Sequence, residues 1–220
     1  TSMQVVDAHK SVNGFETVIT GKASHSSKPQ LGINAIHAAG RLISELAAIE
    51  DEMKARADEP RFEPPYTNVA VTVVDGGTAR NITPEECRFT WMFRAVPATD
   101  PDEIVGRFNR VVEEKVLPMM KAAGPEASIE TTQKSDVPPL NAPAGSEAVS
   151  LALKLAGQNE THAVSYGTEG GLFERAGFSS VVIGPGDIAQ AHTPDEYIEE
   201  NELEKCTAFL DRLADHAEAG

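Results

Sequence analysis

The sequence lacks the features that would indicate binding to a membrane or to nucleic acid. It contains no apolar run of the roughly 18 to 20 residues that a membrane-spanning helix needs. Basic residues are few, since 19 Lys and Arg stand against 34 Asp and Glu and give a net charge of −15. Phosphates of nucleic acid and anionic lipids are bound through clustered basic surface. We therefore expect no nucleic-acid partner and no membrane, and a first segment without a basic region or an apolar stretch favours a cytoplasmic protein.

Cysteine is also scarce, and the two cysteines are far apart in the sequence. Cys87 falls in an apolar strand pattern and Cys206 in a helix pattern. This spacing does not suggest a metal knuckle or a redox pair, and the preferred interpretation is two buried free thiols in a reducing compartment.

Residues 12–134 alternate between strand and helix patterns. The hydrophobic periodicity predicts a helix whose apolar stripe contains Ile36, Ile43, Leu46 and Met53, and a strand with Phe89, Trp91 and Phe93 on one face. The elements follow in the order strand 15–20, helix 33–57, strand 69–74, strand 88–95, a helix from Asp100 and a weaker strand 128–132. The order βαββαβ is that of a ferredoxin-like, two-layer domain.

Residues 135–220 follow a proline-rich loop and have a different pattern. We expect a helix at 146–156, strands at 162–166 and 179–183, and a short helix at 171–176. The last helix is expected to begin at Asn201, which forms a capping box with Glu204. Its buried residues are expected to be Leu203, Cys206, Leu210 and Leu213. The unalternating strand 179–183 favours an α/β sheet covered on both faces. Either this part pairs with a short strand within residues 1–11 as a small appendage, or it is the last portion of a larger sheet, and we favour the second.

Three motifs in a fixed order carry a resemblance to a known family. They are Gly21–Ser27 with Leu31–Ile36, Gly76–Pro84 with Phe93 and Arg94, and Gly184–Tyr197. The chain resembles the metallopeptidase family that contains acetylornithine deacetylase, succinyl-diaminopimelate desuccinylase, aminoacylases and carboxypeptidase G. The resemblance implies an α/β protein in which a ferredoxin-like α+β lid, the dimerisation domain, is followed by the C-terminal part of a zinc-aminopeptidase-like catalytic domain.

Metal binding is the first function that the resemblance implies. Members of the family hold two divalent ions, usually zinc and in some cases cobalt, and only their last histidine ligand has a match here, His192. Taken alone, His192 would be a surface-loop histidine. Since a catalytic zinc ion needs three or four ligands, we expect this chain by itself to bind no metal ion stably.

His25 follows a strand and is surrounded by serines, which alone would indicate a polar turn. The resemblance implies a catalytic role, in which His25 donates a hydrogen bond to the oxyanion in the active site of the neighbouring subunit. It also implies a homodimer that forms through the ferredoxin-like domain.

Four further residues are candidates for substrate binding. Asn81 and Arg94 lie on neighbouring segments, and we expect both at the same mouth of the sheet, where they resemble residues that hold the substrate's carboxylate. Without the resemblance, Arg94 would be interpreted as a strand arginine exposed to solvent. Members of the family usually have an acidic residue two positions before this arginine, and this chain has Met92 there. Gly167 and Glu169 belong to a segment that is similar to acetylornithine deacetylase. Glu169 is either a partner for the substrate's amine or an ordinary acid at a helix start.

These residues together predict an N-acyl amino acid amidohydrolase. Among family members the resemblance is greatest to the deacetylase that converts N-acetylornithine to ornithine and acetate in arginine biosynthesis. Two alternatives remain, namely a related deacylase such as succinyl-diaminopimelate desuccinylase, and a noncatalytic dimerisation module.

Overall fold

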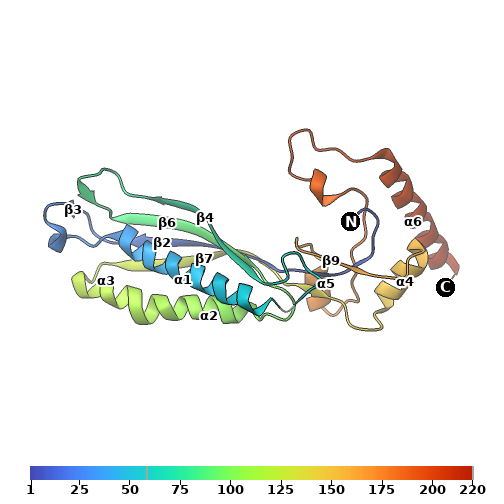
Figure 1. Ribbon diagram of the computed structural model, residues 1–220, viewed down its shortest axis with the longest axis horizontal. Helices are drawn as coiled ribbons and strands as arrows, with labels where there is room; N and C mark the ends of the chain where they lie inside the picture. The colour runs from blue at the N-terminus through green and yellow to red at the C-terminus, as the bar shows by residue number, and fades with distance from the viewer. Residues whose placement is uncertain (58, 220) are drawn as a thin grey trace. The chain divides into compact units, whose positions relative to one another are not determined.

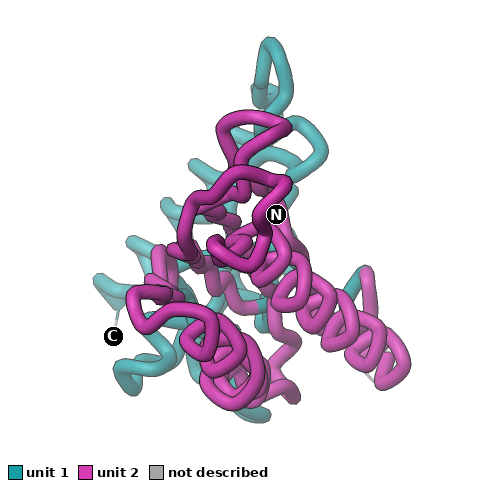
Figure 2. Tube along the Cα trace, turned by 90° about the vertical axis from the view of Figure 1, so that its left-hand side faces the viewer, with its two compact units in different colours: residues 1–10, 61–63, 137–220 teal, residues 11–60, 64–136 magenta. Residues whose placement is uncertain are grey.

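The computed structural model describes residues 1–57 and 59–219, and the chain divides into two compact units (Figure 2). Unit 1 comprises residues 1–10, 61–63 and 137–220, and unit 2 comprises residues 11–60 and 64–136. The sequence predicted boundaries after residues 11 and 134. The structure divides the chain after Lys10 and Asp136 and adds three residues, 61–63, to unit 1.

Unit 2 has the predicted βαββαβ order (Figure 1). Its main elements are β2 (Val12–Thr20), α1 (Ala35–Arg56), β4 (Asn68–Gly76), β6 (Glu86–Arg94), α2 (Pro101–Val111) and β7 (Ser128–Val137). The strands form one sheet in the order β4-β6-β2-β7. Asp100 caps α2, as expected, by accepting a hydrogen bond from the backbone N–H of Asp102. A short π-helical segment, η2 (Val112–Val116), joins α2 to α3 (Leu117–Ala123).

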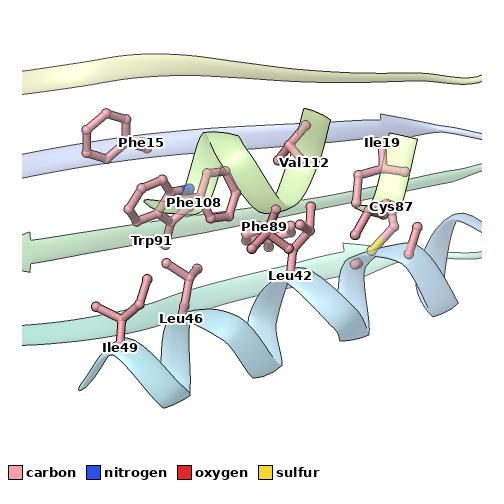
Figure 3. Close-up of a cluster of buried hydrophobic side chains, with 14 of the residues drawn as sticks. Phe15, Ile19, Leu42, Leu46, Ile49, Cys87, Phe89, Trp91, Phe108 and Val112 are labelled. Atoms are coloured by element: carbon pink, nitrogen blue, oxygen red, sulfur yellow. The ribbon is translucent and has the colours of Figure 1, made fainter. Parts of the chain in front are cut away.

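The core of unit 2 lies between the two helices and one face of the sheet (Figure 3). Trp91 is fully buried. Its ring stacks on that of Phe15 with centroids 4.3 Å apart and lies tilted against that of Phe108 with centroids 4.6 Å apart. Its indole N–H donates to the Thr17 hydroxyl at 3.1 Å, so the one polar atom of this side chain is satisfied. The predicted stripe of α1 is wrong at its first member, because Ile36 is 39% exposed.

One end of unit 2 is a small ribbon that we call the tip, residues 21–34 and 77–85. Within it β3 (Ser24–His25) pairs antiparallel with β5 (Ile82–Thr83), and η1 (Pro29–Leu31) follows. Two reciprocal backbone hydrogen bonds of 2.9 Å join Lys22 to Ile33. Only glycine fits at position 21, since a Cβ there would lie 2.1 Å from the Ile33 carbonyl oxygen. The tip is therefore held by backbone pairing and close packing.

Unit 1 contains a small mixed sheet in the order β8-β1-β9. Its strands are β1 (Val6–His9), β8 (Leu140–Asn141) and β9 (His162–Val164), with β1 parallel to β9 and antiparallel to β8. The helices are α4 (Glu147–Ala156), α5 (Gly170–Arg175) and α6 (Glu200–Ala219), and η3 (Ile188–Gln190) is a short 3-10 turn. The later part of the chain thus pairs with the strand near the beginning of the sequence.

The predicted strand at 179–183 is wrong. Of these residues only Val182 forms a bridge, with two hydrogen bonds of 2.9 Å to Val6. The rest of β1 already pairs with β8 on one side and with β9 on the other. Within the described chain, residues 179–183 therefore have no further strand with which to pair. The apolar residues of this segment are half-buried rather than buried.

The last helix differs from the prediction in its start and its buried face. α6 begins at Glu200, so Asn201 lies inside the first turn and is not its cap. Glu202 and Phe209 are buried, whereas Leu203 and Leu210 are 48% and 54% exposed. Glu202 is held there because it accepts hydrogen bonds from Lys205 and from the backbone N–H of Gly186.

The thiols match the prediction only in part. Both cysteines are free, and Cys87 is buried, but Cys206 is half-buried. Within residues 1–57 and 59–219, no helix is both long and apolar enough to cross a membrane.

Candidate functional site

His25 lies on the exposed surface of the tip, at the end of β3. Its ring Nδ1 is 2.8 Å from the Ser27 hydroxyl and accepts a hydrogen bond from the Ser27 backbone N–H at 3.2 Å. The other ring nitrogen, Nε2, has no hydrogen-bond partner within the described chain. The imidazole is therefore held at one nitrogen and open at the other.

Asn81 lies beside His25, as the β3–β5 pairing requires. Its carbonyl oxygen accepts a 2.9 Å hydrogen bond from the Ser26 backbone N–H, and the next residue, Ile82, pairs directly with His25. An open cleft of about 670 Å³ adjoins the pair, and its polar lining includes Ser26, His37 and Arg80. The structure thus brings together two of the candidate residues, one able to donate from an imidazole and one from an amide.

Arg94 lies at the opposite end of β6, which corrects the expectation of one shared mouth. Arg94 pairs with Asn68 at the beginning of β4, whereas the tip joins the sheet where Gly76 pairs with Cys87. Arg94 lies seven positions beyond Cys87 along β6, which corresponds to roughly 24 Å at about 3.4 Å per residue. One chain therefore cannot place Asn81 and Arg94 on the same small carboxylate.

The Arg94 side chain is half-buried on the same side of β6 as Met92. This face is opposite to the one that Phe89, Trp91 and Phe93 bury against the helices. Among the described residues none forms an ion pair with Arg94. The guanidinium is therefore available to an anion that the described chain does not supply.

Arg80, in the cleft beside Asn81, is a cation that the sequence did not single out. It too forms no ion pair within the part of the chain that the structure describes. The signal for it was its place within the Gly76–Pro84 motif, immediately before Asn81.

In unit 1 the candidate metal ligand His192 is an exposed loop residue with a left-handed backbone, at φ 60°. Its backbone N–H donates to the Glu196 carboxylate at 2.9 Å. The loop that precedes it is capped at Asp187, which accepts from the backbone N–H of Ala189 at 2.8 Å. That hydrogen bond is the main cause that lowers the pKa of Asp187, and the Ser2 hydroxyl lowers it further.

A cavity of about 270 Å³ lies next to this loop, and Tyr166, Asp187 and Glu196 are among its lining residues. Burial raises the pKa of Tyr166, and the negative charge of Asp187 adds to the effect. A neutral phenol that can donate a hydrogen bond is the form favoured in this cavity.

Gly167 and Glu169 belong to the loop between β9 and α5. Glu169 is exposed and occupies the position before α5, but its side chain makes no capping hydrogen bond. Instead Thr168 supports the turn, since its hydroxyl accepts from the backbone N–H of Gly170 at 3.1 Å. Both interpretations of Glu169 are compatible with this position.

The residues described do not form a metal site by themselves. No group of three or more His, Cys, Asp and Glu side chains is gathered for a metal ion anywhere in residues 1–57 and 59–219. His192 offers one imidazole, and the carboxylate of Glu196 accepts a hydrogen bond from the His192 backbone N–H. Two divalent ions would need further ligands.

Known proteins similar to this chain include acetylornithine deacetylases and peptidases. The family model described as the peptidase dimerisation domain matches residues 7–120. The chain is 32% identical over 216 residues to acetylornithine deacetylase of Myxococcus xanthus and 29% identical over 216 residues to that of Proteus mirabilis. These alignments cover 98% of this chain but 55% and 54% of the relatives, so the chain spans about half of their length.

Solved structures share the fold at low sequence identity. An aminopeptidase from Bacillus cereus is similar with a TM-score of 0.72 at 19% identity, over 96% of this chain and 53% of that one. An M20 family metallo-carboxypeptidase from Sulfolobus solfataricus is similar with a TM-score of 0.64 at 18% identity, over 95% of this chain and 59% of that one. The ferredoxin-like unit and its matched residues lead to one assignment: the chain belongs to the M20 peptidase dimerisation-domain family.

Proposed function

We propose that the chain forms the dimerisation domain and a later catalytic portion of a metal-dependent N-acyl amino acid amidohydrolase that hydrolyses N-acetylornithine to acetate and ornithine. The observation that carries the proposal is similarity to acetylornithine deacetylases along 98% of the chain. In the intact enzyme two divalent ions, zinc or cobalt, would supply an activated water, and His192 would be one of their ligands. This chain's own residues then bind and orient the substrate.

His25 is proposed as the oxyanion donor. Its open Nε2 faces away from the turn that holds Nδ1, so it can donate to a carbonyl oxygen that gains negative charge. No proton leaves the imidazole in this role. The tip carries no metal ligand in this proposal, so the active site that it completes belongs to a second subunit.

The separation of Asn81 from Arg94 divides substrate binding between two sites. Asn81 lies with His25, and we assign its amide to the neighbouring subunit's substrate. Arg94 lies where the chain enters and leaves unit 2, because the next residue, Ala95, is bonded to Ser11. We assign Arg94 to the carboxylate of the substrate bound by its own subunit. Gly167 and Glu169 of unit 1 are proposed as further substrate contacts, with Glu169 as the partner of the substrate's amine.

A homodimer is proposed to form along the free edge of β4. β4 is one edge of the sheet, and its second half exposes Val73 and Val74 at 58% and 55%. The other edge, β7, carries charged side chains, and its Lys134 pairs with Glu16. Charged side chains protect an edge strand from pairing, whereas an apolar edge favours it. The β4 edge is therefore the one suited to a second copy.

The dimer is tested by placing a charge on each edge in turn. Val73→Lys should weaken self-association at least tenfold, measured by sedimentation equilibrium. Thr132→Lys, at an exposed position on β7, is the matched control and should leave association unchanged. Equal effects of the two substitutions would contradict pairing along β4.

The activity is tested on the polypeptide from its natural source. Intact mass spectrometry first shows whether further residues accompany this chain, and the isolated protein is then assayed with zinc or cobalt on N-acetylornithine and on N-succinyl-diaminopimelate. We expect faster release of acetate than of succinate. The reverse order would favour the desuccinylase, and no turnover of either would favour a noncatalytic dimerisation module. Tight binding of two zinc ions with turnover by residues 1–220 alone would contradict the incomplete metal site.

A further inference from the structure

The backbone that carries His25 is fixed on both sides. The His25 carbonyl oxygen accepts from the Lys28 N–H at 2.8 Å, which closes a four-residue β-turn. Across the ribbon, the Ser26 N–H donates to the Asn81 carbonyl at 2.9 Å. With the backbone held in this way, the orientation of the imidazole depends on what its ring nitrogens contact.

Two groups of Ser27 contact the same ring nitrogen. The Ser27 backbone N–H points at Nδ1 across 3.2 Å, and the Ser27 hydroxyl oxygen lies 2.8 Å from it. A backbone N–H can only donate, so Nδ1 must present its lone pair. A hydrogen on Nδ1 would point at the hydrogen of that N–H. In the neutral imidazole the single ring proton is therefore on Nε2.

We propose that Ser27 is a positioning residue whose hydroxyl and backbone N–H together select the Nε2–H tautomer of His25 and aim that N–H away from the turn. The inference rests on the proposed function, in which His25 Nε2–H donates to the oxyanion in the neighbouring subunit. The opposite tautomer would present a lone pair to the oxyanion and repel it. A serine two residues after the histidine thus decides whether the imidazole can act as a donor.

The tautomer is measured directly by NMR of the chain with ring-¹⁵N histidine, at a pH where the ring is neutral. His25→Gln identifies the His25 signals. We expect Nε2 to have the shift of a protonated nitrogen and Nδ1 that of an unprotonated one. Ser27→Ala removes the hydroxyl but keeps the backbone N–H, so both shifts should move part of the way toward the average of the two tautomers. Ser27→Thr keeps the hydroxyl and should restore the original shifts.

Ser26→Ala is the matched control, since only the backbone of Ser26 is engaged in the turn. It should leave the His25 shifts unchanged. A wild-type spectrum with the proton on Nδ1, or shifts unaffected by Ser27→Ala, would overturn the proposal.

A kinetic experiment on the active holoenzyme separates this proposal from the proposed function. Ser27→Ala should lower kcat about tenfold with little change in KM, which is less than the 100- to 1000-fold typical for loss of an oxyanion donor, expected for His25→Ala. Ser27→Thr should recover the rate. If His25→Ala retains full activity, the oxyanion role is wrong. The NMR shifts still decide whether Ser27 selects the tautomer.

Discussion

The two units differ in how completely they bury their apolar side chains. In unit 2 the aromatic residues Phe15, Trp91 and Phe108 are at most 4% exposed and contact one another. The core cluster of unit 1 is small, with Met3, Leu155 and Phe209 as its buried members. Elsewhere in unit 1, Phe173 and Phe178 are 58% and 64% exposed. Unit 2 therefore has the packing of a self-contained domain, and unit 1 leaves apolar surface uncovered within the chain described.

The largest expected effect tests the core of unit 2. Trp91→Ala removes a fully buried indole and its ring contacts with Phe15, Phe93 and Phe108, and it should lower the free energy of unfolding by about 3–5 kcal/mol. Phe173→Ala in unit 1 should change it by less than about 0.5 kcal/mol, since that ring is exposed. Urea unfolding followed by far-UV circular dichroism gives both values. Similar losses in the free energy of unfolding for the two variants would contradict the difference in packing between the units.

Two glycines, one in each unit, compare how easily the surrounding backbone can move when a Cβ atom is added. A Cβ at Gly21 in unit 2 and one at Gly171 in unit 1 would each lie 2.1 Å from a carbonyl oxygen, of Ile33 and Pro138 respectively. We expect Gly21→Ala to cost about 3 kcal/mol and Gly171→Ala about 1 kcal/mol, because the loop at Pro138 can move more easily than the paired tip. Thermal and urea unfolding provide the comparison.

Gly40→Ala is the control for that pair. A Cβ at Gly40 meets nothing within 4 Å inside α1, so the substitution should stabilise unit 2 by up to about 1 kcal/mol. A larger loss for Gly171→Ala than for Gly21→Ala would reverse the proposed order of rigidity.

Neighbouring residues of α6 test the small core of unit 1. Phe209→Ala should cost about 2 kcal/mol, less than Trp91→Ala, because its cluster is small and can collapse around the gap. Leu210→Ala, next to it but 54% exposed, should be close to neutral. Hydrogen exchange of α6 and α4 amides reports the loss locally. A greater loss of stability for Leu210→Ala than for Phe209→Ala would support the buried helix face that the sequence predicted.

The smallest expected effect depends on pH and on His9 in unit 1. His9 is fully buried, its Nδ1 donates to the Lys10 carbonyl at 2.9 Å, and its Nε2 has no partner in the described chain. Burial lowers the pKa of His9 below the ordinary 6.5. The unfolded chain then binds a proton more readily than the folded one as the pH falls through and below 6.5. Stability of unit 1 is therefore complete above that pH and declines below it.

The measurement is the urea midpoint at pH 7.5, 6.5 and 5.5 for the original chain and for His9→Gln, which cannot titrate. We expect the original chain to lose more stability across this interval than the variant loses. Parallel curves would show that His9 does not couple protons to folding.

The sequence predicted unit 2 well because local and tertiary preferences agree there. The alternation of Phe89, Trp91 and Phe93 and the cap at Asp100 both indicate the elements that form. Unit 1 was predicted less well. The run 179–183 is apolar, but strand formation also requires a free ladder partner, and the sequence does not show that β1 is already paired on both sides.

The candidate site shows the same limit. The structure places His25 beside the segment that carries Asn81, and the sequence did not predict this pairing. The separation of Arg94 could not be deduced from a spacing of 13 residues, because it depends on a loop before β6 that folds back as part of the tip. The hydrogen bonds of Ser27 to His25 also depend on that turn geometry.

The assignment of residues 61–63 to unit 1 has a consequence for proteolysis. The chain passes between the units after Lys10, Pro60, Glu63 and Asp136. In unit 1 the three-residue excursion is anchored by the ion pair of Arg61 with Asp7, by buried Phe62, and by the Glu63 carbonyl, which accepts from the Ser165 hydroxyl at 2.6 Å. A protease that cuts one of these four passages leaves three covalent links intact. A nicked chain should therefore migrate as two fragments in denaturing gels and as one particle in native ones.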